Sequence, residues 1–200
     1  MENIPNNSDK KSEAPKKPRK IKRIYEGLTE DEFIKLLNVT KKLHHKLAFI
    51  LGYGSGLRVS EIIKLQPADV DFKAGKIFVR MGKGSKDRIV NIPKQFKEKY
   101  LSVLPIDISV RALEAIFLRN SLKAGINRII GYYDAKGKNM PLYRLRVHSL
   151  RHSYAIRALE LGVPINQLQI LLGHENLATT SKYTKANPHD AIQSIIDKGV

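Results

Sequence analysis

The apolar residues of this 200-residue chain repeat at helical spacing along most of its length and alternate with polar residues in one short region. Two β-branched runs there, residues 76–80 and 88–93, are joined by the glycine-rich sequence MGKGSKD. Alternation on both sides of a glycine-rich turn is typical of a β-hairpin. Because helical patterns flank this hairpin and no long strand is evident, the sequence predicts a mostly α domain with a small antiparallel β-sheet, of the α+β class.

Three helices are expected before the hairpin. Thr29 and Glu32 have the spacing of a capping box, so the first helix should begin there. The second should run through residues 43–51 and end in the glycine-punctuated segment 52–56. A third should follow at once, with Arg58 in its first turn. These helices would supply the first half of the core.

Two further helices are expected directly after the hairpin. Pro93 should open one that runs through Leu104, and Ser109 should cap another that ends near Gly125. Residues 126–146 are the hardest part to interpret, because they contain only the turn-like sequence DAKGKN and the basic run YRLR. No regular element is predicted for them.

The helical pattern returns at His148, and the first helix there should stop at Gly162. A shorter helix should close at Gly173, and residues 188–198 predict a tail helix with one apolar face. At the other end, residues 1–23 lack apolar periodicity and predict a disordered basic tail. We therefore expect one folded domain, residues 24–200, without a separate N-terminal domain.

The charge of the chain indicates a polyanionic partner. The formal net charge is +17, and the tail accounts for little of it, because residues 1–23 carry eight Lys or Arg and three Asp or Glu, which leaves +12 on the rest. Nucleic acid, in particular double-stranded DNA, is favoured over a membrane surface, since no strongly amphipathic basic helix is evident. The absence of cysteine and of long apolar runs suits a soluble cytoplasmic protein.

Several residues have the chemistry needed to cleave a phosphodiester without a metal, which requires a nucleophile, cations and an acid. Arg58 and Arg151 are candidate clamps, because one guanidinium can contact two phosphate oxygens. His148 precedes Arg151 by three residues, so the two can share a helical face, and Tyr183 follows His174 by nine. Taken alone, each has an ordinary structural explanation as a surface ion pair or a packing side chain.

No cofactor or metal site is expected. The sequence HSLRH places two histidines four residues apart, but it lacks the glutamate that follows the first histidine in HExxH zinc sites. The chain also has no P-loop and no carboxylate cluster suited to magnesium.

In order along the chain, GLRVSE, GKGSKDR, HSLRH, LLGH and a tyrosine nine residues after that last histidine resemble the motifs of the tyrosine recombinase family, also called the phage integrase family. The resemblance is to its Xer-like catalytic domains and extends from about Thr29 to Tyr183. It implies six catalytic residues: Arg58, Lys83, His148, Arg151, His174 and Tyr183.

The resemblance also implies a role for each of them. The two arginines would clamp the scissile phosphate, and the two histidines would position it and balance its charge. Lys83, on the hairpin turn, would be the general acid toward the leaving 5′ oxygen, and Tyr183 would be the nucleophile that forms a 3′-phosphotyrosyl link. Glu61 matches an acidic residue that supports the site without taking part in the chemistry. The implied activity is site-specific DNA cleavage and rejoining without metal or ATP.

Two features of such relatives bear on the whole protein. Relatives usually carry a separate N-terminal helical domain that holds the opposite face of the DNA, so this chain is either a fragment or a short natural form. Their C-terminal helix often docks into a neighbouring protomer of a synaptic tetramer, a role that residues 188–198 suit, although this helix could also fold back on its own domain.

Two rival interpretations stay open. Residues 161–183 have the cadence of a helix-turn-helix, so the chain could be a DNA-binding regulator or an inactive integrase-like protein. A type IB topoisomerase uses related phosphotyrosyl chemistry, but the compact order of the motifs fits recombinases better. The target site, and whether the task is dimer resolution, integration or inversion, do not follow from the sequence.

Overall fold

The computed structural model describes residues 26–80 and 87–173 of the chain. The basic tail expected over residues 1–23 and the tail helix expected over residues 188–198 lie outside the described residues. The described part is built of helices with two small antiparallel sheets, which confirms the predicted fold class.

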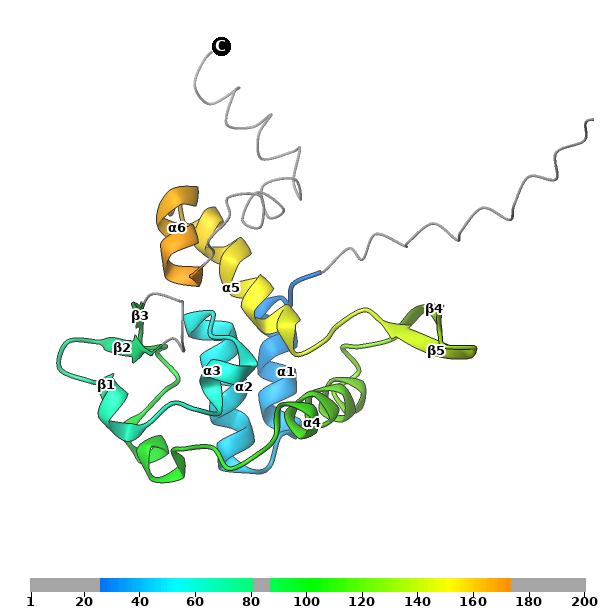
Figure 1. The fold of residues 1–200 in the computed structure, drawn as a ribbon, viewed down its shortest axis with the longest axis horizontal. Coiled ribbons are helices and arrows are strands. Elements are labelled where there is room, and N and C mark those ends of the chain that lie inside the picture. The colour runs from blue at the N-terminus through cyan, green and yellow to red at the C-terminus, as the bar shows by residue number, and fades with distance from the viewer. Residues whose placement is uncertain (1–25, 81–86, 174–200) are drawn as a thin grey trace, which may run out of the picture.

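The helices form the centre of the domain, and the two sheets lie on opposite sides of them (Figure 1). In chain order the helices are α1 (Glu30–Val39), α2 (Leu43–Ser55), α3 (Val59–Ile62), α4 (Val110–Lys123), α5 (His148–Glu160) and α6 (Ile165–Leu172). Nine of the thirteen residues of α2 are buried, so α2 is the core helix of the domain. Two of its aromatic side chains pack against other helices: Tyr53 stacks on Phe33 of α1, with ring centroids 3.8 Å apart, and Phe49 contacts Phe117 of α4 edge-on.

The first helices begin and end as the sequence predicts. The Thr29 side chain accepts a hydrogen bond from the Glu32 backbone, and the Glu32 carboxylate accepts one from the Thr29 backbone, which completes the capping box. Helix α2 continues through its glycines to Ser55 and ends at Gly56, whose left-handed conformation (φ 67°) closes the helix. The third helix is shorter than expected, a single turn.

The hairpin predicted from the alternating pattern is confirmed. Strands β2 (Lys76–Val79) and β3 (Arg88–Asn91) pair antiparallel, and the short β1 (Val70–Asp71) adds to the other edge of β2. Ile77 pairs with Val90, and both are buried against the helices. The outward-facing Phe78 and Ile89 stay exposed. Residues 81–86, which join the two strands, are outside the described part.

The helix expected from Pro93 to Leu104 is wrong. After a turn the chain forms the 3-10 helix η2 (Glu98–Val103) in place of an α-helix. The residue before it, Lys97, provides no side-chain hydrogen bond to cap it. Phe96 and Tyr100 are nevertheless buried, so their spacing reflects contact with the core and not a continuous helix.

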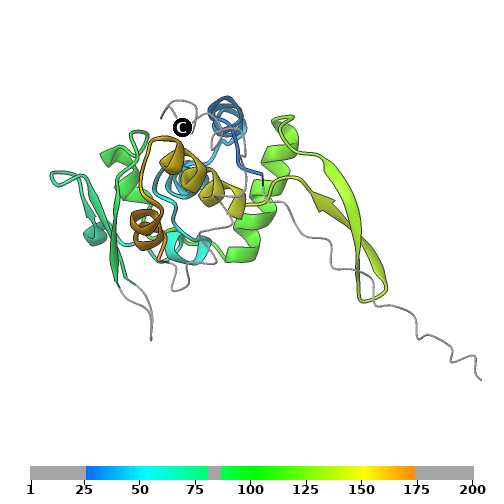
Figure 2. The same cartoon turned by 90° about the horizontal axis from the view of Figure 1, so that it is seen from above.

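The segment for which the sequence predicts no element contains a second hairpin. Strands β4 (Ile129–Ala135) and β5 (Lys138–Tyr143) pair antiparallel around a tight turn at Lys136 and Gly137, both of which have positive φ. The hairpin extends away from the helices, as Figure 2 shows. Most of its residues are exposed or half-buried, so the hydrophobic pattern that marks a buried strand is weak here.

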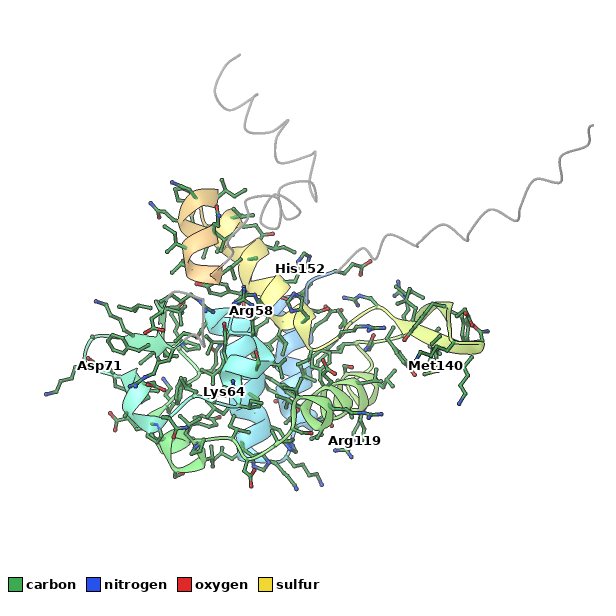
Figure 3. The ribbon with its side chains drawn as sticks, in the orientation of Figure 1. Arg58, Lys64, Asp71, Arg119, Met140 and His152 are labelled. Carbon is green, nitrogen blue, oxygen red and sulfur yellow. The ribbon has the colours of Figure 1, made fainter. Side chains whose placement is uncertain are left out.

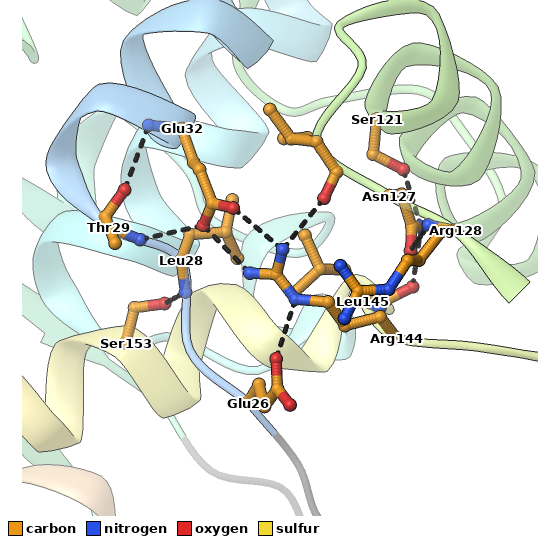
Figure 4. Close-up of polar contacts among 11 residues, drawn as sticks. Glu26, Leu28, Thr29, Glu32, Ser121, Asn127, Arg128, Arg144, Leu145 and Ser153 are labelled. Atoms are coloured by element: carbon orange, nitrogen blue, oxygen red, sulfur yellow. Dashed lines mark hydrogen bonds and ion pairs between the residues drawn. The ribbon is translucent and has the colours of Figure 1, made fainter. Parts of the chain in front are cut away.

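Arg144 anchors the end of β5 to the start of α1 (Figure 4). Its guanidinium donates to both oxygens of Glu32, at 2.8 and 3.0 Å, and its Nε donates to Glu26 at 2.7 Å. Glu32 therefore caps α1 and pairs with Arg144 at the same time. Arg144 lies in the segment that connects β5 to α5, four residues before that helix begins.

Candidate active site

Arg58 is the N-cap residue of α3, one position before the first turn in which it was predicted. Figure 3 shows it where α3 meets the pair α5 and α6. Its side chain donates to Glu61 Oε1 at 2.9 Å and to the carbonyl of Gly173 at 2.8 Å, and its backbone N–H donates to Glu61 Oε2 at 2.7 Å. About a third of the side chain, 34%, is exposed. Arg58 is thus held firmly but can still be reached by a ligand.

Arg151 lies in α5, directly behind this site. Its side chain is only 2% exposed, and it donates to the carbonyl of Gly56 at 2.7 Å and to the carbonyl of Leu172. Its Nη1 is 4.0 Å from Glu61 Oε2. The structure therefore brings together the two arginines that were predicted from motifs 93 positions apart, with Arg58 at the surface and Arg151 buried.

A third arginine, Arg88, completes the group, and sequence reasoning missed it. It is the first residue of β3, and its two Nη atoms donate to the two oxygens of Glu61 at 2.9 and 2.8 Å. Its Nε donates to the carbonyl of Leu171 at 2.7 Å. One signal could have found it: in the alternating pattern Arg88 is on the same face as the buried Val90, where a charge needs a buried partner.

These three arginines and Glu61 are called the arginine cluster below. The Glu61 side chain is 8% exposed. Burial alone would raise its pKa, but hydrogen bonds from Arg88 and from the Arg58 backbone outweigh burial and lower it. Glu61 is therefore ionised at neutral pH. Three guanidinium groups around one carboxylate leave a formal charge of +2, which suits the cluster to binding an anion such as a phosphodiester.

The last turn of α6 contributes three successive carbonyls to the same place. Each accepts a hydrogen bond from a different arginine: Leu171 from Arg88, Leu172 from Arg151, and Gly173 from Arg58. The C-terminal end of a helix carries partial negative charge, so it stabilises a group of cations. Gly173 closes the helix in the left-handed conformation, and a Cβ there would lie 3.2 Å from Arg88 Nη1. A side chain at this position would crowd the cluster.

His148, the first residue of α5, is exposed and precedes the buried part of that helix. Partial burial of its ring, together with the positive charges of Arg151 and Arg58, lowers its pKa. It is therefore neutral at pH 7. His148 also lines a groove of about 650 Å³ between α4 and the β4–β5 hairpin. That His148 and Arg151 serve one site stays a prediction.

The other predicted site residues, Lys83, His174 and Tyr183, lie outside the described residues, so their roles stay predictions. Within residues 26–80 and 87–173, no group of three or more His, Asp or Glu side chains could hold a metal ion. In the same residues no helix is both long and apolar enough to span a bilayer.

Comparison with known proteins gives one consistent family. The sequence pattern of the phage integrase family matches residues 26–190. The chain is 40% identical over 184 residues to "Tyrosine recombinase XerA" of Thermococcus onnurineus, an alignment that covers 88% of this chain and 64% of the relative. The chain thus spans less than two thirds of the length of that relative.

Solved structures agree on the fold. The catalytic domain of bacteriophage HP1 integrase superposes with a TM-score of 0.59 at 22% identity, covering 88% of this chain and 96% of that domain. XerH site-specific recombinase bound to palindromic difH substrate, a post-cleavage complex, superposes with a TM-score of 0.64 at 21% identity, covering 85% of this chain and 52% of that one.

Proposed function

Because this chain belongs to the phage integrase family, we propose that it is the catalytic part of a tyrosine-type site-specific DNA recombinase. The observation that supports this most is the arginine cluster. Arg58 from one motif and Arg151 from another converge on the same carboxylate, and the cluster has a formal charge of +2. A phosphodiester carries the negative charge and the oxygen acceptors that such a group of donors fits.

In the proposed reaction the Tyr183 hydroxyl gives up its proton to solvent as its oxygen attacks the scissile phosphorus, and the bond to the 5′ oxygen breaks. Lys83 gives its proton to that leaving oxygen, and a 3′-phosphotyrosyl bond remains. A 5′ hydroxyl then attacks the same phosphorus, releases the tyrosine and rejoins the DNA, so no net energy input is needed. Arg58 and Arg151 stabilise the charge that builds up on the non-bridging oxygens.

His148 is neutral before DNA binds and takes up a proton when the phosphate arrives. Because its pKa is lowered in the DNA-free protein, its ring can donate one hydrogen bond and accept another at pH 7. A bound phosphate would raise that pKa, so His148 could then carry a proton and balance the phosphate charge.

Double-stranded DNA is the proposed partner, and self-association into a synaptic tetramer in the cytoplasm is part of the proposal. The net charge of +17 would also suit a DNA-binding regulator. The second helix of the predicted helix-turn-helix lies outside the described residues. Such a regulator has no need for arginines gathered around one carboxylate. The enzyme is therefore favoured over the regulator.

A library of nicked duplexes with a randomised centre tests the activity. Cleavage within a few bases of the nick releases a short fragment, so rejoining fails and the covalent adduct accumulates. We expect the chain to be recovered attached to a 3′ phosphate on a subset of sequences, and Tyr183→Phe to yield no adduct. Equal yields from the two proteins, or none from either, would rule out the proposed activity.

The arginines give a second test on any duplex recovered in this way. Arg58→Ala and Arg151→Ala should reduce cleavage by about 10²-fold or more, the usual cost of removing a transition-state donor. DNA affinity should change little, because the broad basic surface supplies most of the binding. Parallel loss of binding and cleavage in a gel-shift assay would support the regulator instead.

A further inference from the structure

We infer that Arg88 is a positioning residue of this active site: it holds Glu61 and the end of α6 so that Arg58 and Arg151 keep the geometry needed for phosphate. The inference rests on the proposed function. Arg88 belongs to the segment GKGSKDR but is not among the residues to which the motif comparison gives a role. Its contacts within the cluster carry the argument.

Arg88 does not itself act as a phosphate clamp. Both Nη atoms donate to Glu61 and the Nε donates to Leu171, so every nitrogen of its guanidinium has a protein acceptor. Its side chain is 4% exposed, against 34% for Arg58. Low exposure alone does not exclude a clamp, since Arg151 is only 2% exposed, but the Arg88 fork is already bound to the two oxygens of Glu61 and cannot hold a phosphate in the same way. Any effect of Arg88 on the reaction has to pass through the groups that it holds.

The first of these groups is the Glu61 carboxylate. Each of its oxygens accepts one hydrogen bond from Arg88 and one from Arg58. The two parallel bonds of the Arg88 fork fix the plane of the carboxylate, and this leaves one lone pair of each oxygen directed at Arg58. Lysine has no such fork and cannot fix that plane. The orientation of Arg58 thus depends on Arg88 through a shared partner.

The second group is the end of α6. The bond from Arg88 Nε to Leu171 holds the last turn whose next two carbonyls face Arg151 and Arg58. Gly173 lies against the same guanidinium. The residue after Gly173 is the predicted second histidine, and Arg88 itself is five residues after Lys83. One buried side chain therefore joins β3, α3 and α6, the elements that carry or adjoin three of the predicted catalytic positions, Lys83, Arg58 and His174.

Cleavage kinetics test this inference. Arg88→Lys keeps the charge but loses the fork, so we expect single-turnover adduct formation to slow by about 10²-fold, the effect of misplacing catalytic groups by about 1 Å. The dissociation constant for DNA should change less than about threefold, because Arg88 is buried. The matched control is Arg144→Lys, which breaks the same bidentate contact with Glu32 away from the cluster. It should lose stability but keep its cleavage rate within about threefold.

A titration of the DNA-free chain gives a readout that does not need cleavage. The charged groups around Glu61 are Arg58 from α3, Arg88 from β3 and Arg151 from α5. Carbon-13 NMR of the Glu61 carboxyl should show a pKa that is higher in Arg88→Lys than in wild type, and higher still in Arg88→Gln. If Arg88→Lys does not fold, Arg88→Gln takes its place in the comparison with wild type. The acid limb of the cleavage rate should move to higher pH in the same order. Arg144→Lys should change neither.

The outcomes separate the two proposals. A wild-type chain that forms no adduct refutes the recombinase, while the Glu61 titration still decides whether Arg88 governs the carboxylate. A wild-type chain that forms the adduct, with Arg88→Lys equal to it in rate and in Glu61 titration, overturns the inference. If Arg88→Lys and Arg144→Lys lose cleavage equally at matched stability, Arg88 is only structural, and the inference is overturned as well.

Discussion

Replacement of Glu61 by glutamine measures how strongly the arginine cluster depends on its one carboxylate. Glu61 accepts four hydrogen bonds, two from Arg88 and two from Arg58. The amide of glutamine can accept only through its oxygen, so at most half of these bonds persist. Its NH₂ group then faces N–H donors, and the formal charge of the cluster rises from +2 to +3.

The cost follows from burial. Removing one partner of a buried ion pair lowers the free energy of unfolding by about 3–5 kcal/mol. The amide of Glu61→Gln keeps some of the hydrogen bonds, so we expect a loss near the lower end, about 3 kcal/mol. For a chain of this length each kcal/mol corresponds to about 2–4 °C, so the melting temperature should fall by about 6–12 °C. Urea unfolding at pH 7, followed by circular dichroism, measures the free energy directly. The control Glu114→Gln, at an exposed position of α4, should stay within about 0.5 kcal/mol of wild type.

The pH dependence gives the sharper result. Burial alone would raise the pKa of Glu61, but the bonds from Arg88 and Arg58 hold it below the ordinary 4.5. A lowered pKa means that this stabilisation is complete above about pH 4.5 and is lost as the pH falls through the folded-state value. The difference between wild type and Glu61→Gln should therefore be constant from about pH 7 to 5 and shrink in more acidic solution. A constant difference down to about pH 3, or no difference at pH 7, would refute the reasoning.

Three other substitutions have defined outcomes. Gly54→Ala would place a Cβ 2.8 Å from Pro93 Cγ, so urea unfolding should show a loss of about 1–3 kcal/mol from overpacking, whereas Gly131→Ala, with no atom within 4 Å of the new Cβ, should show none. Thr29→Ala removes the cap of α1 and should cost about 1 kcal/mol in the same assay. Burial and nearby positive charges lower the pKa of His45 to about 4. The stability that depends on a neutral His45 should therefore be lost as the pH falls from 6.5 toward 4, and an NMR titration that gives the ordinary pKa of 6.5 would contradict this.

Local signals predicted much of the fold. The capping box at Thr29, the alternation of residues 76–80 and 88–93, and the glycine that closes α6 each act within a few residues, and each is confirmed. The two failures have opposite causes, burial against distant partners in one segment and too little burial in the other. Phe96 and Tyr100 are spaced like a helix only because both reach the core, and the β4–β5 hairpin is too exposed to show an alternating pattern.

The site divides in the same way. Arg58 and Arg151 could be selected together because they lie in recognisable motifs, and the structure places both beside the Glu61 carboxylate. The catalytic roles of these arginines and of His148 stay predictions. The bond between Arg88 and Leu171 joins residues 83 positions apart, and the bond between Arg144 and Glu32 joins residues 112 apart. Neither residue of such a pair shows its partner in its local sequence, so long-range hydrogen bonds and ion pairs of this kind can be found only from the fold.

If the arginine cluster binds the scissile phosphate as proposed, the carbonyls at the end of α6 influence how that phosphate is bound. Without DNA, the carbonyl oxygens of Gly173 and Leu172 accept the hydrogen bonds that a phosphate would otherwise accept, and they orient the guanidinium groups of Arg58 and Arg151. An arriving phosphate exchanges one acceptor for another, so the gain in ground-state affinity is small and the solvent has little rearranging to do. The advantage of a charged acceptor grows as negative charge accumulates on the phosphorane oxygens. Under the proposed function, such an arrangement would accelerate the chemical step more than it would strengthen DNA binding.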